Sequence, residues 1–280
     1  MAEQSGDVSA RSGRCWWRCV GLVLLIACGF ILWTGFDRTP AAQAEGTKLE
    51  GEVKRKPTTR TTLKVGTFNI RGGVGMDNRL DLQRIADVIG DCDVVGLNEV
   101  TKAFDGPDEA TVLGEKLGLA HLYAPSERRW WRDHWGNAML SALPVEHWVK
   151  FPMNKTKPNG YRSVLISRQL FNGHAINVIT THTDGSQDRD AQVRTVTSLF
   201  ISMAEPAILM GDFNSAVTHP EIQKMLQVPG VSDCLIDAVK HPVKYRIDFI
   251  FAKGFRVVDA GTIDKGASDH PFYWAELELK

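Results

Sequence analysis

The sequence has little cysteine outside its first forty residues. Of five cysteines, Cys15, Cys19 and Cys28 lie near the N-terminus, which leaves only Cys92 and Cys234 in the main body of the chain. These two are far apart, and neither has a second cysteine or a histidine at the spacing of a zinc site. A zinc module and a disulfide-dense scaffold are therefore excluded. A single disulfide and two buried free thiols both stay open, and free thiols are the favoured interpretation.

The sequence also lacks net charge. Lys and Arg number 33, Asp and Glu number 33, and the formal net charge is zero. This gives no global attraction to nucleic acid or to an anionic membrane, although a local basic patch stays possible. With 280 residues, 43% hydrophobic content and 24% charged content, the chain is typical of a globular protein with one large or two small domains.

A long apolar run is present only near the N-terminus. Val20–Phe36 is uncharged and mostly apolar, follows three arginines, and is close to the minimum length for spanning a bilayer. The small residues of Ala42-Gln43-Ala44 then form a pattern that a signal peptidase could cut. Residues 1–44 are predicted to be a signal peptide or a membrane anchor. The protein is therefore expected to be exported, either secreted, periplasmic or anchored to the membrane through residues 20–36.

The next segment, residues 45–62, is polar and contains alternating charges. Such a composition cannot bury much surface, so it predicts a linker. The folded domain is predicted over residues 63–280.

Apolar patterning within the domain predicts many strands and few helices. Helical spacing is present over 80–89, 108–119 and 189–203. Strand patterns are present over 63–70, 93–100, 136–143, 145–151, 162–167, 175–181, 208–215, 247–252 and 272–279. Because much of the strand order reads as consecutive hairpins, the fold class is predicted to be α+β with at least one largely antiparallel sheet.

Polar residues of catalytic type stand at the ends of these apolar runs. Loops at strand ends, held by a rigid sheet, are where sites are usually built. The sequence has more of these residues at strand ends than ordinary turn formation would explain. The residues are Asn69, Glu99, His182, Asp212 with Asn214, Asp248, and the cluster Ser268-Asp269-His270.

These residue types indicate one kind of chemistry. Carboxylate and amide oxygens without cysteine suit a hard cation, namely Mg²⁺ or Mn²⁺, with Ca²⁺ as a further candidate. Histidines beside them suit proton transfer near neutral pH. A hard metal with Asp and His is well suited to hydrolysis of a phosphate ester, since the metal neutralises phosphoryl oxygens while a base activates water.

Seven short motifs, in order along residues 63–280, resemble the endonuclease/exonuclease/phosphatase superfamily, which has the DNase I-like fold. They are Thr67–Ile70, Gly96–Val100, Gly136–Ser141, Thr181-His182, Gly211–Asn214, Arg246–Ile250 and Ser268–Pro271. The resemblance implies a four-layer α/β/β/α sandwich of two packed, mostly antiparallel sheets with outer helices.

The resemblance also implies roles for the polar residues. It places Glu99, Asn69 and Asp269 at the metal. The implied catalytic residues are His182, Asp212, Asn214, Asp248 and His270, with His270 and Asp248 acting as a pair.

Substrate contacts are expected from a second group of residues. Asn137 lies in a motif, and Arg162 stands where members of the superfamily often carry an arginine. Trp131 and Arg132 belong to an Arg- and Trp-rich segment directly before the Gly136-Asn137 motif. Such a segment could hold a phosphate, stack a base or touch lipid, or its Trp residues could pack over a sheet edge.

The sequence therefore predicts an extracytoplasmic, divalent-metal-dependent phosphoesterase that acts by in-line attack of water. The substrate class stays open between nucleic acid and a lipid or small-molecule phosphate ester. The alternative is a non-catalytic binding module on the same fold. No protein partner is expected, and the chain is expected to be a monomer.

Overall fold

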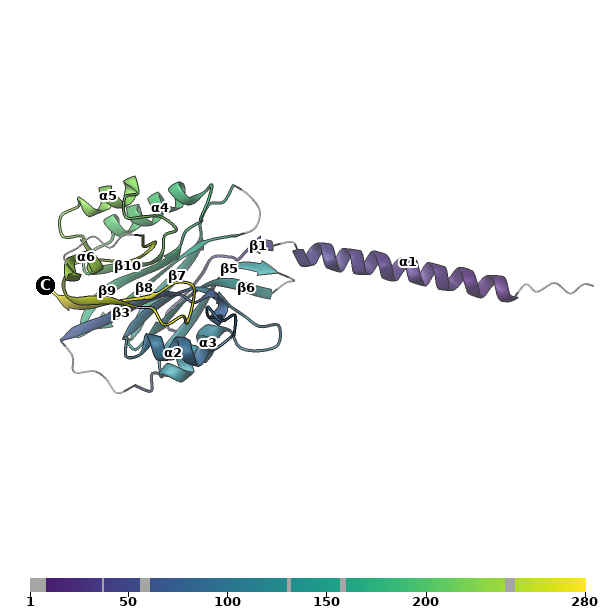
Figure 1. Ribbon diagram of the computed structural model, residues 1–280, viewed down its shortest axis with the longest axis horizontal. Coiled ribbons are helices and arrows are strands. Elements are labelled where there is room, and N and C mark those ends of the chain that lie inside the picture. The colour runs from purple at the N-terminus through teal and green to yellow at the C-terminus, as the bar shows by residue number, and fades with distance from the viewer. Residues whose placement is uncertain (1–8, 37, 56–60, 130–131, 157–159, 240–244) are drawn as a thin grey trace, which may run out of the picture.

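The computed structural model describes residues 9–36, 38–55, 61–129, 132–156, 160–239 and 245–280 (Figure 1). Two seven-stranded sheets pack face to face. The first sheet, in spatial order, contains β1 (Arg38–Pro40), β5 (Ala120–Arg129), β6 (Arg132–Ser141), β4 (Val94–Thr101), β3 (Thr62–Asn69), β14 (Phe272–Leu279) and β13 (Phe255–Ile263). The second contains β11 (Ser232–Asp233), β12 (Asp248–Lys253), β10 (Ala207–Asp212), β9 (His174–His182), β8 (Ser163–Phe171), β7 (Val145–Pro152) and β2 (Ala44–Gly46).

Four of the described helices form the outer layers of the sandwich: α2 (Leu82–Ile89), α3 (Glu109–Leu117), α4 (Arg189–Ser202) and α5 (Pro220–Leu226). The short α6 (Cys234–Val239) contributes Cys234 and Leu235 to the core between the sheets, and α1 (Ser9–Phe36) projects away from the sandwich (Figure 1). Figure 1 shows α2 and α3 on one side of the paired sheets and α4 and α5 on the other. Among the described strands, β3 and β4 are parallel, as are β9 and β10, and the other neighbouring pairs are antiparallel. The predicted α+β class and four-layer arrangement are confirmed.

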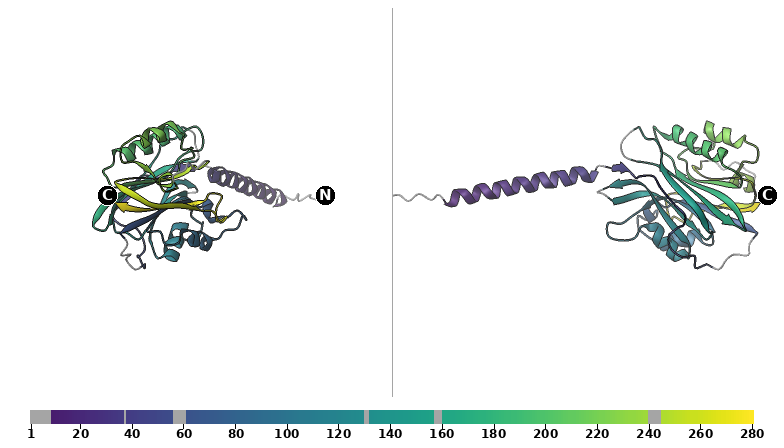
Figure 2. Two further views of the ribbon diagram at one scale, coloured as in Figure 1. Left: turned by 60° about the vertical axis from the view of Figure 1, so that its left-hand side comes forward. Right: turned by 180° about the vertical axis from the view of Figure 1, so that it is seen from behind.

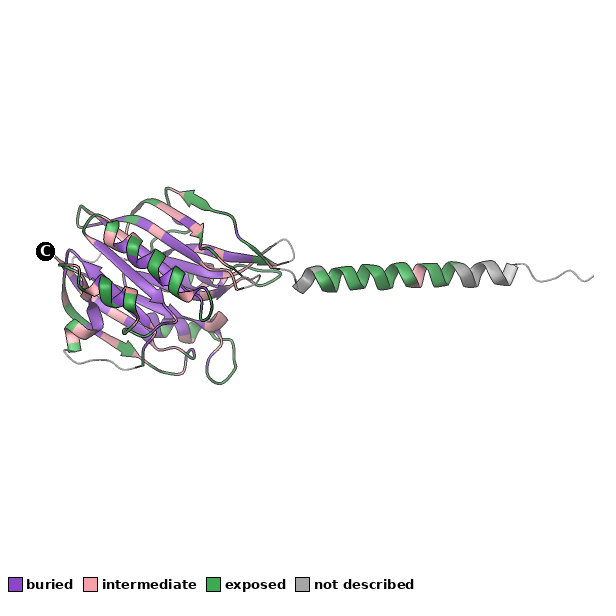
Figure 3. Ribbon diagram, turned by 90° about the horizontal axis from the view of Figure 1, so that it is seen from above, coloured by how far each residue is buried: buried purple, intermediate pink, exposed green. Residues whose placement is uncertain are grey.

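The core has three layers because each sheet buries both faces. Val65, Met139 and Ile208 belong to a cluster of side chains between the two sheets. Ile85 belongs to a second cluster beneath α2 and α3, and Phe200 to a third beneath α4 and α5. Figure 3 shows buried strands beneath helices whose outer faces are exposed. Each fully buried side chain of this size contributes roughly 1.5–3 kcal/mol.

Two of the predicted helices, α2 and α3, begin at capping residues. Asp81 precedes α2 and accepts hydrogen bonds from the backbone N–H of Gln83 and Arg84. Asp108 caps α3 in the same way, and Gly118 ends that helix in the left-handed conformation. The sequence prediction missed β5, β13, α5 and α6. The two helices have only seven and six residues, too few for a helical period to show.

The segment that follows α1 packs against the domain, unlike the predicted linker. β1 pairs with β5 at the edge of one sheet, and β2 pairs with β7 at the edge of the other. Ala41 and Leu49 are buried. Arg55 donates hydrogen bonds to three backbone carbonyls, those of Gly90, Cys92 and Leu117. A polar composition does not prevent such packing, because edge strands pair through the backbone.

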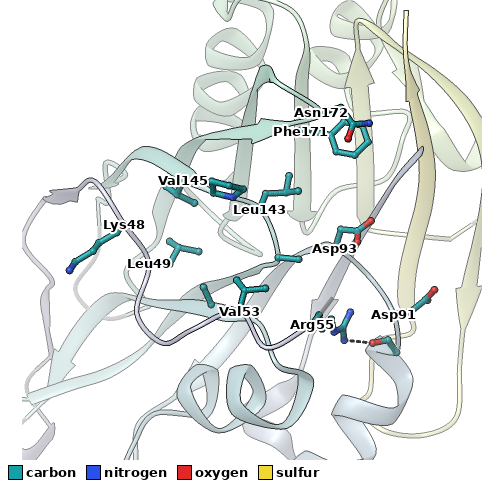
Figure 4. A pocket seen from close by; sticks show the side chains of 14 residues that line it. Lys48, Leu49, Val53, Arg55, Asp91, Asp93, Leu143, Val145, Phe171 and Asn172 are labelled. Atoms are coloured by element: carbon teal, nitrogen blue, oxygen red, sulfur yellow. Dashed lines mark hydrogen bonds between the residues drawn. The ribbon is translucent and has the colours of Figure 1, made fainter. Parts of the chain in front are cut away.

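A cavity of ≈ 890 Å³ lies between this segment and the ends of several strands (Figure 4). Lys48, Leu49 and Val53 line one side, and Val145 and Phe171 line another. The lining residues Asp93 and Asn172 stand next to the amino ends of β4 and β9, respectively.

The two cysteines of the domain are free thiols, as favoured from the sequence. Cys92 belongs to the cluster beneath α2 and α3, whereas Cys234 belongs to the cluster between the sheets. Burial raises the pKa of Cys92 to about 12, so this thiol is neutral and unreactive at physiological pH.

Gly211, near the end of β10, marks a close approach of two strands. Its φ is 143°, and a Cβ atom there would lie 1.9 Å from the carbonyl oxygen of Thr181 on β9. We expect Gly211→Ala to lower the free energy of unfolding by on the order of 3 kcal/mol, because backbone must move. Gly173→Ala is the matched control: its φ is 80° and nothing lies near its Cβ position, so about 1 kcal/mol is expected. Urea unfolding of both variants measures the difference, and equal losses would contradict this account.

Candidate active site

The sheet topology brings the predicted polar residues to one end of the sandwich. The carboxyl ends of β3, β4, β9 and β10 lie at that end, because β3 is parallel to β4 and β9 to β10. β12 and β14 run antiparallel to β10 and β3, so their amino ends lie there too. The residues brought to this end are Asn69, Glu99, His182, Asp212, Asp248 and His270.

Asp212 is the centre of the hydrogen-bond network. The Asn69 side chain donates from Nδ2 to Oδ2 of Asp212 over 3.1 Å, and the backbone N–H of Asn214 donates to Oδ1 over 2.8 Å. Nε2 of His182 lies 3.4 Å from Oδ2 of Asp212, and Nε2 of His270 lies 3.9 Å from it. Burial raises the pKa of Asp212 to about 6, and the neighbouring charge of Asp248 adds to the effect.

His270 and Asp248 form the predicted pair. Nδ1 of His270 lies 2.8 Å from Oδ2 of Asp248, while the other oxygen of that carboxylate is buried without a hydrogen-bond partner. Burial acts to lower the pKa of His270. The hydrogen bond and charge of Asp248 outweigh it, and together with Asp212 and Asp269 they raise the pKa of His270 to about 9. In the absence of a cation, His270 is therefore protonated at neutral pH.

His182 differs from His270 in both burial and charge. Its side chain is 2% exposed, and burial lowers its pKa well below 6.5, with the charges of Arg162 and His270 adding to the shift. Nδ2 of Asn214 donates to the Thr183 carbonyl and lies 3.0 Å from Nε2 of His182. Because a carbonyl can only accept, that nitrogen is the amide NH₂, and Nε2 of His182 accepts a hydrogen bond from it. His182 thus orients Asn214, while Nδ1 of His182 is buried and forms no hydrogen bond with the described residues.

Asn69, Glu99 and Asp269 offer oxygen atoms on adjoining elements. Asn69 is the register partner of Asn98, which directly precedes Glu99 in β4. The hydroxyl of Ser268 donates to the carbonyl of Asn69 over 2.7 Å and lies 3.1 Å from Oδ1 of Asp269. Glu99 is half-buried and Asp269 is exposed. Of the three predicted metal residues, Glu99 and Asp269 reach solvent, whereas Asn69 is buried.

Two residues of this site have strained backbone. The φ angles of Glu99 and Asn214 are 56° and 44°, values that non-glycine residues adopt at a cost of roughly 1–2 kcal/mol. Glu99 also lies where the pairing of β4 with β6 shifts register between Leu97 and Val100. Such irregularities commonly re-aim a side chain beside an active site.

Asn98 lies directly behind the site, and the sequence analysis did not single it out, although its motif contained it. Its Nδ2 donates to Oδ1 of Asn137 and to the carbonyl of Thr181, and its Oδ1 accepts from the backbone N–H of Asp212. Asn137 has no exposed surface, and its Nδ2 donates to the carbonyl of Ser163. The geometry thus corrects the expectation that Asn137 contacts substrate. With Asn98 it joins the two sheets behind the site.

Arg162 lies beside the site. Its guanidinium lies 4.5 Å from the ring of Trp135, whose own ring lies 5.3 Å from His182. Burial lowers the pKa of Arg162, while the charges of Asp184, Glu99 and Asp212 oppose that shift. Trp131 lies outside the described residues, and so does the side chain of Arg132, whose backbone begins β6.

The chain belongs to the endonuclease/exonuclease/phosphatase family. The model of that family matches residues 66–270, a range that contains every residue of the site. The family resemblance predicted from the seven motifs is therefore confirmed. Among curated proteins, no sequence matches the chain.

Solved structures share the fold. An endonuclease/exonuclease/phosphatase from Beutenbergia cavernae is 27% identical, with a TM-score of 0.63 over 79% of this chain and 72% of that one. A functionally unknown conserved protein from Enterococcus faecalis is 19% identical, with a TM-score of 0.64 over 78% of this chain and all of its own. TDP2 from D. rerio, complexed with a single-strand DNA product, is 18% identical, with a TM-score of 0.57 over 79% of this chain and all of its own.

The two histidines should titrate very differently in protein freed of divalent cations by EDTA. We expect a pKa near 9 for His270 and no protonation of His182 down to well below pH 6.5. A raised pKa in the folded state stabilises the fold fully below pH 6.5, and that contribution is lost as the pH rises through about 9. The Hε1 chemical shifts in NMR spectra recorded against pH measure both values.

Asp248→Asn should lower the pKa of His270 from about 9, because the hydrogen bond and charge of Asp248 are lost while only the charges of Asp212 and Asp269 still oppose burial. Asp190→Asn is the matched control, since Asp190 is exposed and pairs with His219 instead. An unchanged pKa of His270 in Asp248→Asn would rule out the pairing described here.

Proposed function

We propose that this protein is a divalent-metal-dependent phosphoesterase that hydrolyses a phosphodiester or phosphomonoester outside the cytoplasm. The observation that carries the proposal is the buried Asp212 carboxylate between the His270–Asp248 pair and Asn69, at strand ends that also hold Glu99. Membership of a family of metal-dependent phosphoesterases supports it.

The residues present fit a divalent cation. Asn69, Glu99 and Asp269 would hold Mg²⁺ or Mn²⁺, with Ca²⁺ as a further candidate, because carboxylate and amide oxygens are the ligands these ions prefer. Among the described residues, none forms a hydrogen bond with the Glu99 carboxylate, so its oxygens are available. When bound, such an ion neutralises charge on phosphoryl oxygens and lowers the pKa of water.

Asp212, Asp248 and His270 form a second group that could hold a metal ion, with ligand atoms within 4.8 Å of one another. In that group Nδ1 of His270 and one oxygen of Asp248 are already joined by a hydrogen bond of 2.8 Å. A cation coordinated by Nδ1 of His270 would have to replace that bond. We therefore assign this group to proton transfer and charge stabilisation.

The position of each residue suggests a role around phosphorus. Asp212 lies at the centre of the site, between Asn69 and the His270–Asp248 pair, and in this proposal it accepts a proton from the attacking water. The His270 cation, fixed by Asp248, and the Arg162 guanidinium stabilise negative charge on the phosphoryl oxygens. Asn214, oriented by His182, aligns the substrate.

Neither the family nor the fold identifies which class of phosphate ester this protein hydrolyses. The DNA product in the TDP2 complex belongs to that protein, and an 18% identical structure supports the fold alone. A non-catalytic binding module is the alternative function. No observation favours it, since every polar position expected of an active member is occupied in this sequence.

Hydrolysis of bis-p-nitrophenyl phosphate by the full chain tests the proposal. We expect turnover with Mg²⁺ or Mn²⁺ that EDTA abolishes. Glu99→Gln and His270→Ala should each lower kcat by roughly 10²–10⁴-fold. The matched controls, Glu146→Gln and His147→Ala, change exposed residues distant from the site and should retain full activity. Equal activity in all four variants would leave no catalytic role for this site.

Binding of Mn²⁺, measured by isothermal titration calorimetry, tests where the cation lies. Glu99→Gln should weaken binding by about tenfold or more, and Asp248→Asn should change it less. The reverse order would place the cation on Asp212, Asp248 and His270.

A further inference from the structure

The end of α1 is held close to the active-site end of the sandwich by the chain itself. α1 ends at Phe36 and β1 begins at Arg38, so one residue separates them. Two peptide units span at most about 7 Å. Wherever α1 points, its last residue must therefore lie next to β1.

β1 lies at the same end of the sandwich as the catalytic residues. Pro40 pairs with Glu127 on β5, and Glu127 pairs with Trp135 on β6, whose ring lies 5.3 Å from that of His182. Two strand spacings are about 10 Å, so α1 ends within roughly 30 Å of His182. Figures 1 and 2 show α1 leaving from the tip of β5 and β6, at the end opposite the C-terminus.

α1 has the properties of a helix that spans a bilayer. Trp16–Trp33 has a mean hydropathy of 1.9, and no part of it is buried against the domain. Its 18 residues span about 27 Å, close to the thickness of the hydrocarbon layer. Tryptophan stands at both ends, as is typical of interfacial anchors, and the arginines before it favour a cytoplasmic N-terminus.

Residues before the Ala42-Gln43-Ala44 pattern are part of the folded domain, which indicates that α1 is retained. Ala41 is 3% exposed, and its backbone N–H donates to the carbonyl of Ser126. The Arg38 guanidinium lies 3.0 Å from the carboxylate of Glu127, a side chain that is 1% exposed. Cleavage after Ala44 would remove β1 and leave the buried Glu127 without this partner, which is costly.

We propose that α1 is a retained anchor that holds the active-site end of the sandwich toward the bilayer, and that the substrate is the phosphodiester of a membrane phospholipid. This inference rests on the proposed phosphoesterase function. A phospholipid is confined to the surface that the site faces, whereas a nucleic acid would have to enter between that end and the bilayer. The zero net charge of the chain gives no attraction for such a polyanion.

The tip of β5 and β6 supports this orientation. This tip lies beyond Trp135, on the side where α1 joins the domain, and it carries Arg128 and Arg129 on β5. Arginines at that position would lie at the level of lipid phosphates.

The reaction would be hydrolysis of one ester bond of the head-group phosphodiester. The oxygen of water forms a bond to phosphorus and loses a proton to Asp212. One ester P–O bond breaks, and the departing alkoxide takes up a proton from solvent, to which Asp212 returns the proton that it accepted. The products are an alcohol and a phosphomonoester, and which of them keeps the acyl chains identifies the bond that was cut.

The test uses the full chain reconstituted in vesicles of phosphatidylcholine, phosphatidylethanolamine and phosphatidylglycerol with Mn²⁺. Mass spectrometry follows diacylglycerol and phosphatidic acid, and bis-p-nitrophenyl phosphate and a single-stranded oligonucleotide are assayed in parallel. In one variant, a rigid helical spacer of four EAAAK repeats, about 30 Å long, follows Phe36. The control carries the same spacer after Lys280.

We expect the spacer after Phe36 to lower lipid hydrolysis by about tenfold or more, since the site then lies away from the bilayer. Hydrolysis of bis-p-nitrophenyl phosphate should stay within about twofold, which also shows that the variant folds. The C-terminal spacer should change neither rate. Protein recovered from membranes of an export-competent host should retain the mass of α1.

Three results would overturn the inference while leaving the phosphoesterase proposal intact. They are turnover of bis-p-nitrophenyl phosphate without lipid hydrolysis, lipid hydrolysis that the spacer after Phe36 does not change, and loss of the first 44 residues from the recovered protein. Cleavage of the oligonucleotide without lipid hydrolysis would identify a nuclease. No turnover of any substrate would overturn both proposals together.

Discussion

The buried carboxylate of Asp212 is the constraint on which the arrangement of the site depends. A carboxylate removed from water needs donors or cations close to it. Here the donors are the side chain of Asn69 and the backbone of Asn214, and the cation is His270. They come from both sheets and from the loops beside them, so the two sheets must meet at the correct offset. Asn98 and Asn137 set that offset through hydrogen bonds that cross from one sheet to the other.

Different surroundings give the two histidines of the site opposite charge states. His270 is partly exposed and bonded to a carboxylate, whereas His182 is enclosed beside an arginine and accepts a hydrogen bond from an amide. Because the two environments separate the pKa values of the two histidines, one site can hold a cationic histidine and a neutral, orienting histidine at the same pH.

The N-terminal segment links the sheets to each other and to α1. One part extends the edge beyond β5, the next extends the edge beyond β7, and Arg55 then binds carbonyls at the far end of the sandwich. The pairing of β1 with β5, which covers one of these edges, also fixes the position at which α1 leaves the domain. Stability of the sheet edges and the position at which α1 leaves the domain therefore depend on the same few residues, although their composition is that of a linker.

The sequence by itself determined the strands with strong apolar runs, the capped helices and the identity of the polar residues that follow those strands. Apolar periodicity and caps are local, and so is the position of Glu99 or Asp212 at a strand end. Only the tertiary structure decided which polar residues face solvent and which lie behind the site. Asn137 was expected to contact substrate and His182 to be catalytic, yet both are buried, and their hydrogen-bond partners lie on segments distant in the chain. The packing of 45–55 also came from pairing with distant strands, and burial and long-range pairing cannot be read from neighbouring residues.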